Sequence, residues 1–193
     1  MKNKIKNVNV AELIETYRRV LYYFFGFPDD SIGLNDLSES VSMSKTSTRL
    51  AVNHLTKEGF LKIEEIGKSL RISVTDRADP YFIIKKIPYN LQLVYESGIL
   101  GAVYDKVPNA KAIILFGSYR WGTDSKISDI DIAVEITGEE EMKIDKIGVI
   151  QELGFRKNVQ VNLHIFSRKK IDKRLFSNIA NGIILEGFLE VSL

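Results

Sequence analysis

One segment, residues 112–135, constrains the fold of this chain more than any other. A short apolar run that ends at Gly117-Ser118 predicts a buried strand, and a second strand begins with Asp129 and Asp131. Because side chains alternate along a strand, both carboxylates point to one face while the isoleucines between and after them face the core. Two carboxylates beside a Gly-Ser turn suit a divalent metal that carries a nucleotide triphosphate.

The spacing of this segment resembles the signature of the nucleotidyltransferase superfamily, which includes DNA polymerase beta and the minimal nucleotidyltransferases. That signature is Gly-Ser, ten residues and Asp-x-Asp, and residues 119–128 fill the interval here. The resemblance implies transfer of a nucleoside monophosphate from an NTP with release of pyrophosphate. It assigns Gly117 and Ser118 to the phosphates, and Asp129 and Asp131 to Mg²⁺ or Mn²⁺.

Two other residues of the interval are candidates for nucleotide binding. Arg120 stands one position earlier than the basic residue of the minimal enzymes, and Trp121 occupies that residue's usual place. The guanidinium fork suits a phosphate, so we expect Arg120 to contact the triphosphate. Ser128 precedes the metal strand, where its side chain can cap the turn.

A third strand is expected over residues 158–166, and it lacks the acid that the family usually carries there. Asn162 stands at the expected position, with Gln160 and His164 on the same face. An amide oxygen can accept a metal or a hydroxyl, but it cannot take a proton at neutral pH. His164 is open to two interpretations: a replacement for the missing base, or a histidine hydrogen-bonded within the sheet. The resemblance therefore implies Asp129, Asp131 and Asn162 as the catalytic positions and leaves turnover open.

The N-terminal half predicts helices over 9–25, 35–41 and 45–58, then a hairpin over 60–66 and 70–74. This order resembles the winged helix-turn-helix of MarR-type and ArsR-type regulators, which implies contacts with double-stranded DNA. The residues assigned to the major groove are Lys45, Thr46, Arg49 and Asn53, and those assigned to the wing are Lys68 and Arg71. The alternatives are an ordinary solvated helix face, or a winged helix used for dimerisation or protein binding.

The chain is thus predicted to be an α+β protein with a small mixed sheet in its C-terminal domain. We expect a winged helix-turn-helix domain over 9–78, a helical linker over 79–108 and a nucleotidyltransferase-like domain over 109–193. Pro88 is expected to end a helix, so that separate helices follow near Tyr89 and Ile99. Glu139–Glu141 predict the start of a helix that reaches about Leu153.

Composition excludes several classes of function. The formal net charge is only +2 over 193 residues, so any contact with DNA must come from local placement of basic residues. The absence of cysteine excludes disulfides, thiolate metal sites and cysteine nucleophiles, and two histidines are too few for a histidine-rich metal centre. No apolar run spans a bilayer and no signal sequence is visible, so we expect no membrane partner and a cytoplasmic location.

Three functions stay open from the sequence. In the first, a DNA-binding protein binds NTP and metal and transfers an NMP to a protein or small-molecule hydroxyl. In the second, the C-terminal domain is catalytically degenerate, and a transcriptional regulator uses it to sense a nucleotide or to form a homodimer. In the third, the protein is an antitoxin-like modifier of a partner toxin, as minimal nucleotidyltransferases paired with HEPN proteins are.

Overall fold

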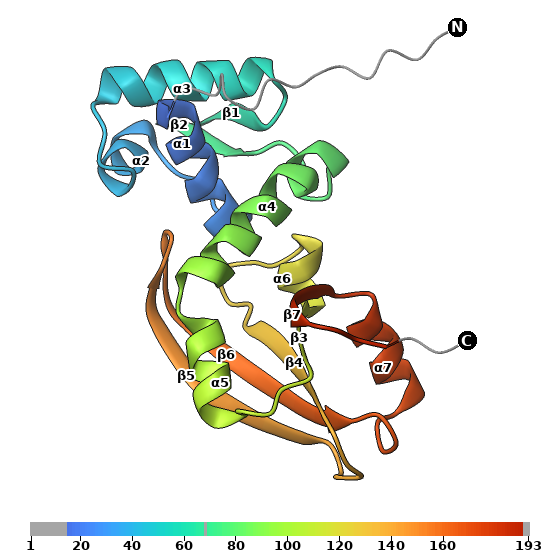
Figure 1. Ribbon diagram of the computed structural model, residues 1–193. Coiled ribbons are helices and arrows are strands. Elements are labelled where there is room, and N and C mark those ends of the chain that lie inside the picture. Colours follow the sequence, from blue (N-terminus) through green and yellow to red (C-terminus); the bar gives the residue numbers. More distant parts are fainter. Residues whose placement is uncertain (1–14, 68, 191–193) are drawn as a thin grey trace, which may run out of the picture. The chain divides into compact units, whose positions relative to one another are not determined.

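A computed structural model describes residues 15–67 and 69–190, which divide into two compact units between Asp76 and Arg77 (Figure 1). Each unit has its own core and is described by itself. Within the described ranges, none of the helices combines the length and the apolar character needed to cross a bilayer.

The first unit contains three helices and a two-stranded hairpin. These elements are α1 (Glu15–Gly26), α2 (Leu34–Ser40), α3 (Lys45–Lys57), β1 (Leu61–Ile66) and β2 (Ser69–Val74). Ser44 caps α3, because its Oγ accepts a hydrogen bond of 3.1 Å from the backbone N–H of Ser47. The strands pair antiparallel, and Ile32 adds an isolated bridge to Ile72. The order and bounds agree with the sequence expectation, except that the predicted start of the first helix lies outside the described residues.

The second unit is built on a five-stranded sheet with strand order β5-β6-β4-β3-β7. The strands are β3 (Ala112–Phe116), β4 (Ile130–Ile136), β5 (Lys143–Leu153), β6 (Arg156–Ser167) and β7 (Ile183–Gly187). Only the pair β4–β6 is parallel, and the other neighbours run antiparallel. The sheet is therefore mixed and the chain is α+β, as the sequence predicted.

Both faces of this sheet are covered. On one face, side chains of α4 (Pro80–Glu96) and α5 (Ile99–Lys106) join the inward residues of the central strands in one apolar cluster. On the other face, α7 (Lys173–Ala180) packs against a smaller cluster that includes Ile114 and Phe166. Residues 79–108, expected as a linker, thus form helices that supply part of the core of the second unit.

The prediction that Pro88 ends a helix is wrong, because α4 runs through it from Pro80 to Glu96. Pro88 is exposed, whereas Phe82, Lys86 and Asn90 on the opposite face are buried. An interior proline costs a helix about 3 kcal/mol. The contacts of the buried face outweigh that cost.

The helix predicted over 139–153 is also wrong, because residues 143–153 form the edge strand β5. This segment contains several β-branched residues, which favour an extended chain, and Gly148, which disfavours a helix. It pairs antiparallel with β6 through a tight turn at Gly154, whose φ is +61°. Hairpin pairing with β6 therefore prevails over the acidic start signal at Glu139–Glu141.

Gly122 offers a test of how the loop after β3 is fitted to α4. Its φ is +68°, and an added Cβ would lie 3.1 Å from Cγ1 of Ile87 and 3.4 Å from the carbonyl oxygen of Ile83. We expect Gly122→Ala to lower the free energy of unfolding by about 1–3 kcal/mol, measured by urea denaturation. Gly101→Ala is the matched control: it lies in α5 with no atom near its added Cβ, and should raise stability by about 0.5–1 kcal/mol. Equal effects of the two substitutions would contradict this account.

Candidate active site

The Gly-Ser turn and the Asp-x-Asp strand lie side by side. β3 ends at Phe116, which pairs with Asp131 of β4, and the short helix α6 (Gly117–Trp121) begins at the next residue. Gly117 has φ +73°, and an added Cβ would lie only 2.8 Å from Oδ2 of Asp131. Only glycine therefore allows the backbone to approach the carboxylate this closely. Ser118 follows, half-buried, as the second residue of α6.

Asn162 joins the two carboxylates. Parallel pairing of β4 with β6 sets Asn162 opposite Asp131. Its Nδ2 group donates to Oδ2 of Asp129 and to Oδ1 of Asp131, each at 3.2 Å. The three side chains that the sequence assigned as catalytic positions thus meet at one point above the sheet.

His164 extends this cluster along β6. Its Nε2 lies 3.3 Å from Oδ1 of Asp131, and its ring meets the ring of Phe116 edge-on. This contact is the main cause of a lowered pKa of Asp131; burial opposes it and the Asn162 hydrogen bond adds to it. Nδ1 of His164 is buried and has no hydrogen-bond partner among the residues that the structure describes. The ring is therefore held against Asp131 by one nitrogen only.

The remaining candidates of the loop have contacts within the protein. Nε of Arg120 donates to the carbonyl oxygen of Asn181 at 2.8 Å, and its guanidinium lies 3.7 Å from the centre of the Trp121 ring. Oγ of Ser128 accepts from the backbone N–H of Ser125 at 3.0 Å. Ser128 therefore closes the turn before Asp129, in the manner expected from its position in the sequence.

A buried polar network behind the loop was missed at the sequence level. It consists of Lys86 and Asn90 of α4, Asp124 of the loop and Arg156 of β6, each no more than 5% exposed. Nζ of Lys86 lies 3.1 Å from Oδ1 of Asp124, and Nδ2 of Asn90 donates to the same oxygen at 2.7 Å. Burial lowers the pKa of Lys86 and raises that of Asp124, and their attraction opposes both shifts. One signal was available: Phe82, Lys86 and Asn90 are spaced by four, so an apolar helix face carries an amine and an amide.

The DNA-binding candidates lie in the first unit. Lys45, Thr46, Arg49 and Asn53 are exposed on α3, whereas Thr48, Val52 and Leu55 on its other side are buried. Arg71 is half-buried on β2, and Lys68 falls outside the described residues. The exposed and buried faces of α3 are thus those that the sequence predicted.

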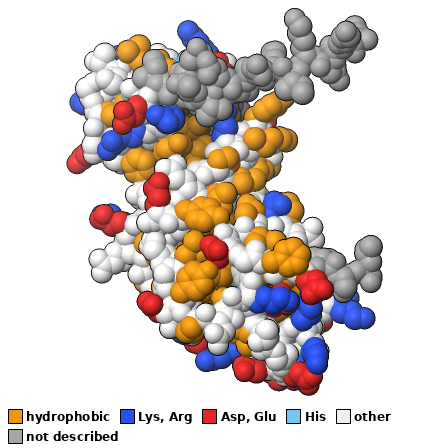
Figure 2. Space-filling view, in the orientation of Figure 1, with side chains coloured by type: hydrophobic (Ala, Val, Ile, Leu, Met, Phe, Trp, Pro, Cys, Tyr) orange, Lys and Arg blue, Asp and Glu red, His pale blue; other side chains and the backbone are white. Residues whose placement is uncertain are grey.

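The surface of the second unit carries charges of both signs. Figure 2 shows Lys and Arg interspersed with Asp and Glu on the face in view. Several basic residues after β6 pair with acids after β4: Lys169 with Glu139 at 2.5 Å, and Lys170 with Glu141 at 3.3 Å. These pairs leave little net field around that end of the sheet.

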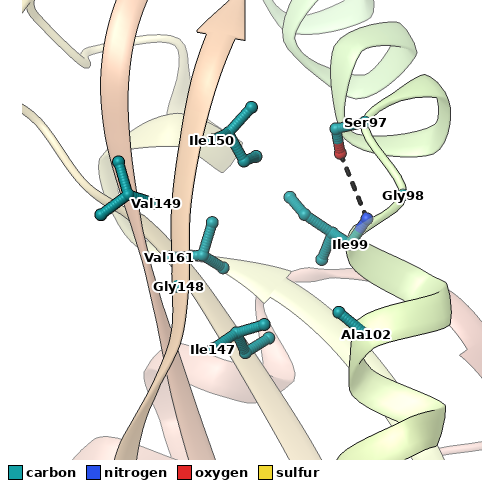
Figure 3. A pocket seen from close by; sticks show the side chains of 9 residues that line it. All are labelled: Ser97, Gly98, Ile99, Ala102, Ile147, Gly148, Val149, Ile150 and Val161. Carbon is teal, nitrogen blue, oxygen red and sulfur yellow. Dashed lines mark hydrogen bonds between the residues drawn. The ribbon is translucent and has the colours of Figure 1, made fainter.

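A separate hollow of about 200 Å³ lies between the α4–α5 junction and β5 (Figure 3). Its lining is mainly aliphatic and includes Ile99, Ile147 and Val161. The hydroxyl of Ser97 is already bonded to the carbonyl oxygen of Val94 at 2.8 Å and accepts from the N–H of Ile99. None of the candidate site residues lines this hollow, so it is separate from the Asp129–Asp131 site.

The contact between Asp131 and His164 predicts a pH dependence in metal-free protein. The folded-state pKa of Asp131 lies below its ordinary value, which is about 3.9. The ionised carboxylate therefore stabilises the fold above that value, and this stabilisation is lost as pH falls through the folded-state pKa. In His164→Leu we expect the pKa of Asp131 to rise, and acidification below pH about 4 to cost less stability than in wild type.

The measurement is an NMR titration of the carboxyl carbons without divalent metal. Asp145 is an internal control, because hydrogen bonds from Lys143 and Lys106 lower its pKa independently of His164. An unchanged pKa of Asp131 in His164→Leu would contradict the account.

Comparison with known proteins bears on the same part of the chain. No curated protein matches the sequence. Residues 96–185 match a family model described as "Nucleotidyltransferase domain", and the matched segment contains Gly117, Ser118, Asp129, Asp131 and Asn162. This match supports the resemblance to the nucleotidyltransferase superfamily for residues 96–185.

Proposed function

We propose that the second unit binds a nucleotide triphosphate together with Mg²⁺ or Mn²⁺ at Asp129 and Asp131, and that the first unit binds double-stranded DNA. The observation that carries the nucleotide site is the convergence of both carboxylates on the Asn162 amide, at 3.2 Å each, beside the Gly117 backbone. Carboxylate oxygens of two residues thus meet beside the turn that the family resemblance assigns to the phosphates.

The side chains present fit a divalent cation. Among the described residues no three His, Cys, Asp or Glu side chains form a complete metal-binding group. Mg²⁺ is usually held by one or two carboxylates, with phosphate oxygens and waters completing its octahedron, so a complete protein cage is not needed. Asp129 and Asp131 would supply carboxylate oxygens, and Asn162 would supply an amide oxygen once its side-chain amide is rotated. A bound cation would neutralise charge on the phosphates.

Ser118 and Arg120 would bind the triphosphate. Ser118 offers a hydroxyl to a phosphate. It follows Gly117, whose α-carbon lies against Asp131. A phosphate bound at Ser118 would therefore lie beside the carboxylates. Arg120 is held by a hydrogen bond from Nε to Asn181 and by the stacking of its guanidinium on Trp121. Its two terminal nitrogens remain suited to a phosphate, because the guanidinium has donors on each of its nitrogens.

The acceptor side of the reaction determines whether the site transfers an NMP. A hydroxyl acceptor, on a protein or a small molecule, must lose its proton in the reaction, and a third carboxylate commonly assists this step. Here Asn162 cannot take a proton. His164 is the remaining group on that strand face, and its Nε2 is bonded to Asp131. The amide at position 162, where a carboxylate was expected, favours a second candidate function. In that function the protein is a nucleotide sensor that binds NTP without transferring an NMP.

Titration calorimetry with the four NTPs and Mn²⁺ tests the binding site. We expect Asp129→Ala with Asp131→Ala to weaken binding by at least about 100-fold, or about 2.7 kcal/mol. The matched control, Glu96→Ala with Asp105→Ala, removes two exposed carboxylates from α4 and α5 and should bind as wild type does. Equal affinity of both double variants would refute the proposed site.

Pyrophosphate release separates the enzyme from the sensor. In the enzyme, wild type releases pyrophosphate from bound NTP when an acceptor is present. In the sensor, wild type binds NTP without release, and Asn162→Asp gains release because it restores the missing carboxylate. Gln151→Glu, which adds one exposed carboxylate on β5, is the charge-matched control.

The first unit has the element order of a winged helix-turn-helix: α2, a tight turn, the capped helix α3 and a hairpin. In this proposal α3 enters the major groove with Lys45, Thr46, Arg49 and Asn53, which are exposed. The hairpin would follow the phosphate backbone with Lys68 and Arg71. Such a unit would bring the nucleotide site to DNA, and we propose a cytoplasmic regulator on this basis.

Binding to duplex DNA at varied salt tests this part of the proposal. Lys45→Ala with Arg49→Ala should weaken binding and lower the slope of log K against log salt by about two, since each phosphate contact contributes about 0.9. The control Lys173→Ala with Arg174→Ala removes the same charges from exposed positions on α7. Absence of binding at low salt in wild type would contradict DNA binding, because the phosphate contribution is largest there.

A further inference from the structure

The segment between Gly117-Ser118 and Asp129 has little regular structure of its own. It contains the short helix α6 and turns, and no residue from 122 to 129 belongs to a strand. A loop without ladder hydrogen bonds opens easily unless other contacts hold it. Yet Ser118 and Asp129, at its two ends, must keep their positions relative to Asp131.

The middle of the loop is tied to the protein through Asp124. This side chain is 1% exposed. Its Oδ1 faces Nζ of Lys86 at 3.1 Å and accepts from Asn90 at 2.7 Å, and its Oδ2 lies 3.8 Å from Nη1 of Arg156. Nζ of Lys86 also donates to the Asp124 carbonyl oxygen at 2.5 Å.

Two of the same partners hold the ends of the loop. Nδ2 of Asn90 donates to the carbonyl oxygen of Tyr119, directly after Ser118, at 2.9 Å. Nη2 of Arg156 donates to the carbonyl oxygen of Ser128, directly before Asp129. One helix and one strand therefore fix the loop next to both functional residues and at its centre.

Burying such a network in a protein interior has a large cost in free energy. Burying a carboxylate, an amine and a guanidinium costs several kcal/mol per ion before pairing, and apolar side chains of similar volume often give equal stability. Lys86, Asn90 and Arg156 each bond to the loop, and Asp124 belongs to it. The network therefore has its effect on the loop, because the loop supplies most of its acceptors.

We propose that Lys86, Asn90, Asp124 and Arg156 are positioning residues, which hold Ser118 and Asp129 in register with Asp131 for the binding of an NTP and its cation. The role of the network in binding an NTP and its cation rests on the proposed function. The holding of the loop itself stands independently of any nucleotide.

Trp121 makes the proposal measurable, because it is the one tryptophan of the chain and lies in α6 between Tyr119 and Asp124. The test variant is Asn90→Leu, which removes the donor to Tyr119 and Asp124 and leaves Asp124 with both of its cationic partners. We expect lower fluorescence anisotropy of Trp121, stronger quenching by acrylamide, and NTP–Mn²⁺ affinity reduced about tenfold.

The control is Val103→Ala, which truncates a fully buried side chain of α5, a helix that contains none of the four residues. It lowers stability as a core truncation does, but the Trp121 signals and NTP affinity of the folded protein should match wild type. If Asn90→Leu does not fold, the double variant Lys86→Met with Asp124→Asn tests the same expectation, since it removes both charges of the pair together.

The outcomes separate the two proposals. Trp121 signals in Asn90→Leu that equal those of Val103→Ala would overturn the network as a holder of the loop, whether or not nucleotide binds. A looser Trp121 with undiminished NTP affinity would overturn its positioning role. A looser Trp121 in a protein whose wild type binds no NTP supports the holding of the loop and refutes the proposed nucleotide site.

Discussion

The register of three neighbouring strands, β3, β4 and β6, is the constraint on which the site depends. It sets Phe116 beside Asp131 and Asp131 beside Asn162. Because successive side chains face opposite sides, a slip of one residue would turn Asp131 into the core and expose Ile132. The apolar side chains on the covered faces of these strands oppose such a slip. Ordinary hydrophobic packing therefore fixes where the carboxylates stand.

Polar contacts hold the parts of the site whose positions are not fixed by hydrophobic packing. The loop between the two halves of the motif has no ladder of its own, and buried groups from α4 and β6 hold it instead. At the candidate site, an amide and a histidine occupy the strand face where the family resemblance implies an acid. Asn162 bonds to both carboxylates and His164 bonds to Asp131. On the proposed function, the transfer step would depend on what His164 or the acceptor supplies.

Sequence reasoning succeeded where a short pattern decides local structure. The apolar run before Gly117, the spacing to Asp129 and the cap at Ser44 each act over a few residues, and the structure has the corresponding elements. It failed where strand pairing or burial prevails over local preference. The acidic start at Glu139–Glu141 suggested a helix, but pairing with β6 made residues 143–153 a strand. Pro88 suggested a break, but the buried face of α4 kept the helix continuous.

The sequence by itself determined the family resemblance of the second unit, the residues that face its site and the absence of the third acid, since all of these follow from residue type, spacing and alternation. Only the tertiary structure decided that Asn162 bonds to both carboxylates, that Arg120 contacts Asn181, and that Lys86 lies buried against Asp124. These contacts join residues that are 31 to 61 positions apart in the sequence. The packing of the helices on the sheet determines which of these residues meet, and no local sequence pattern specifies that packing.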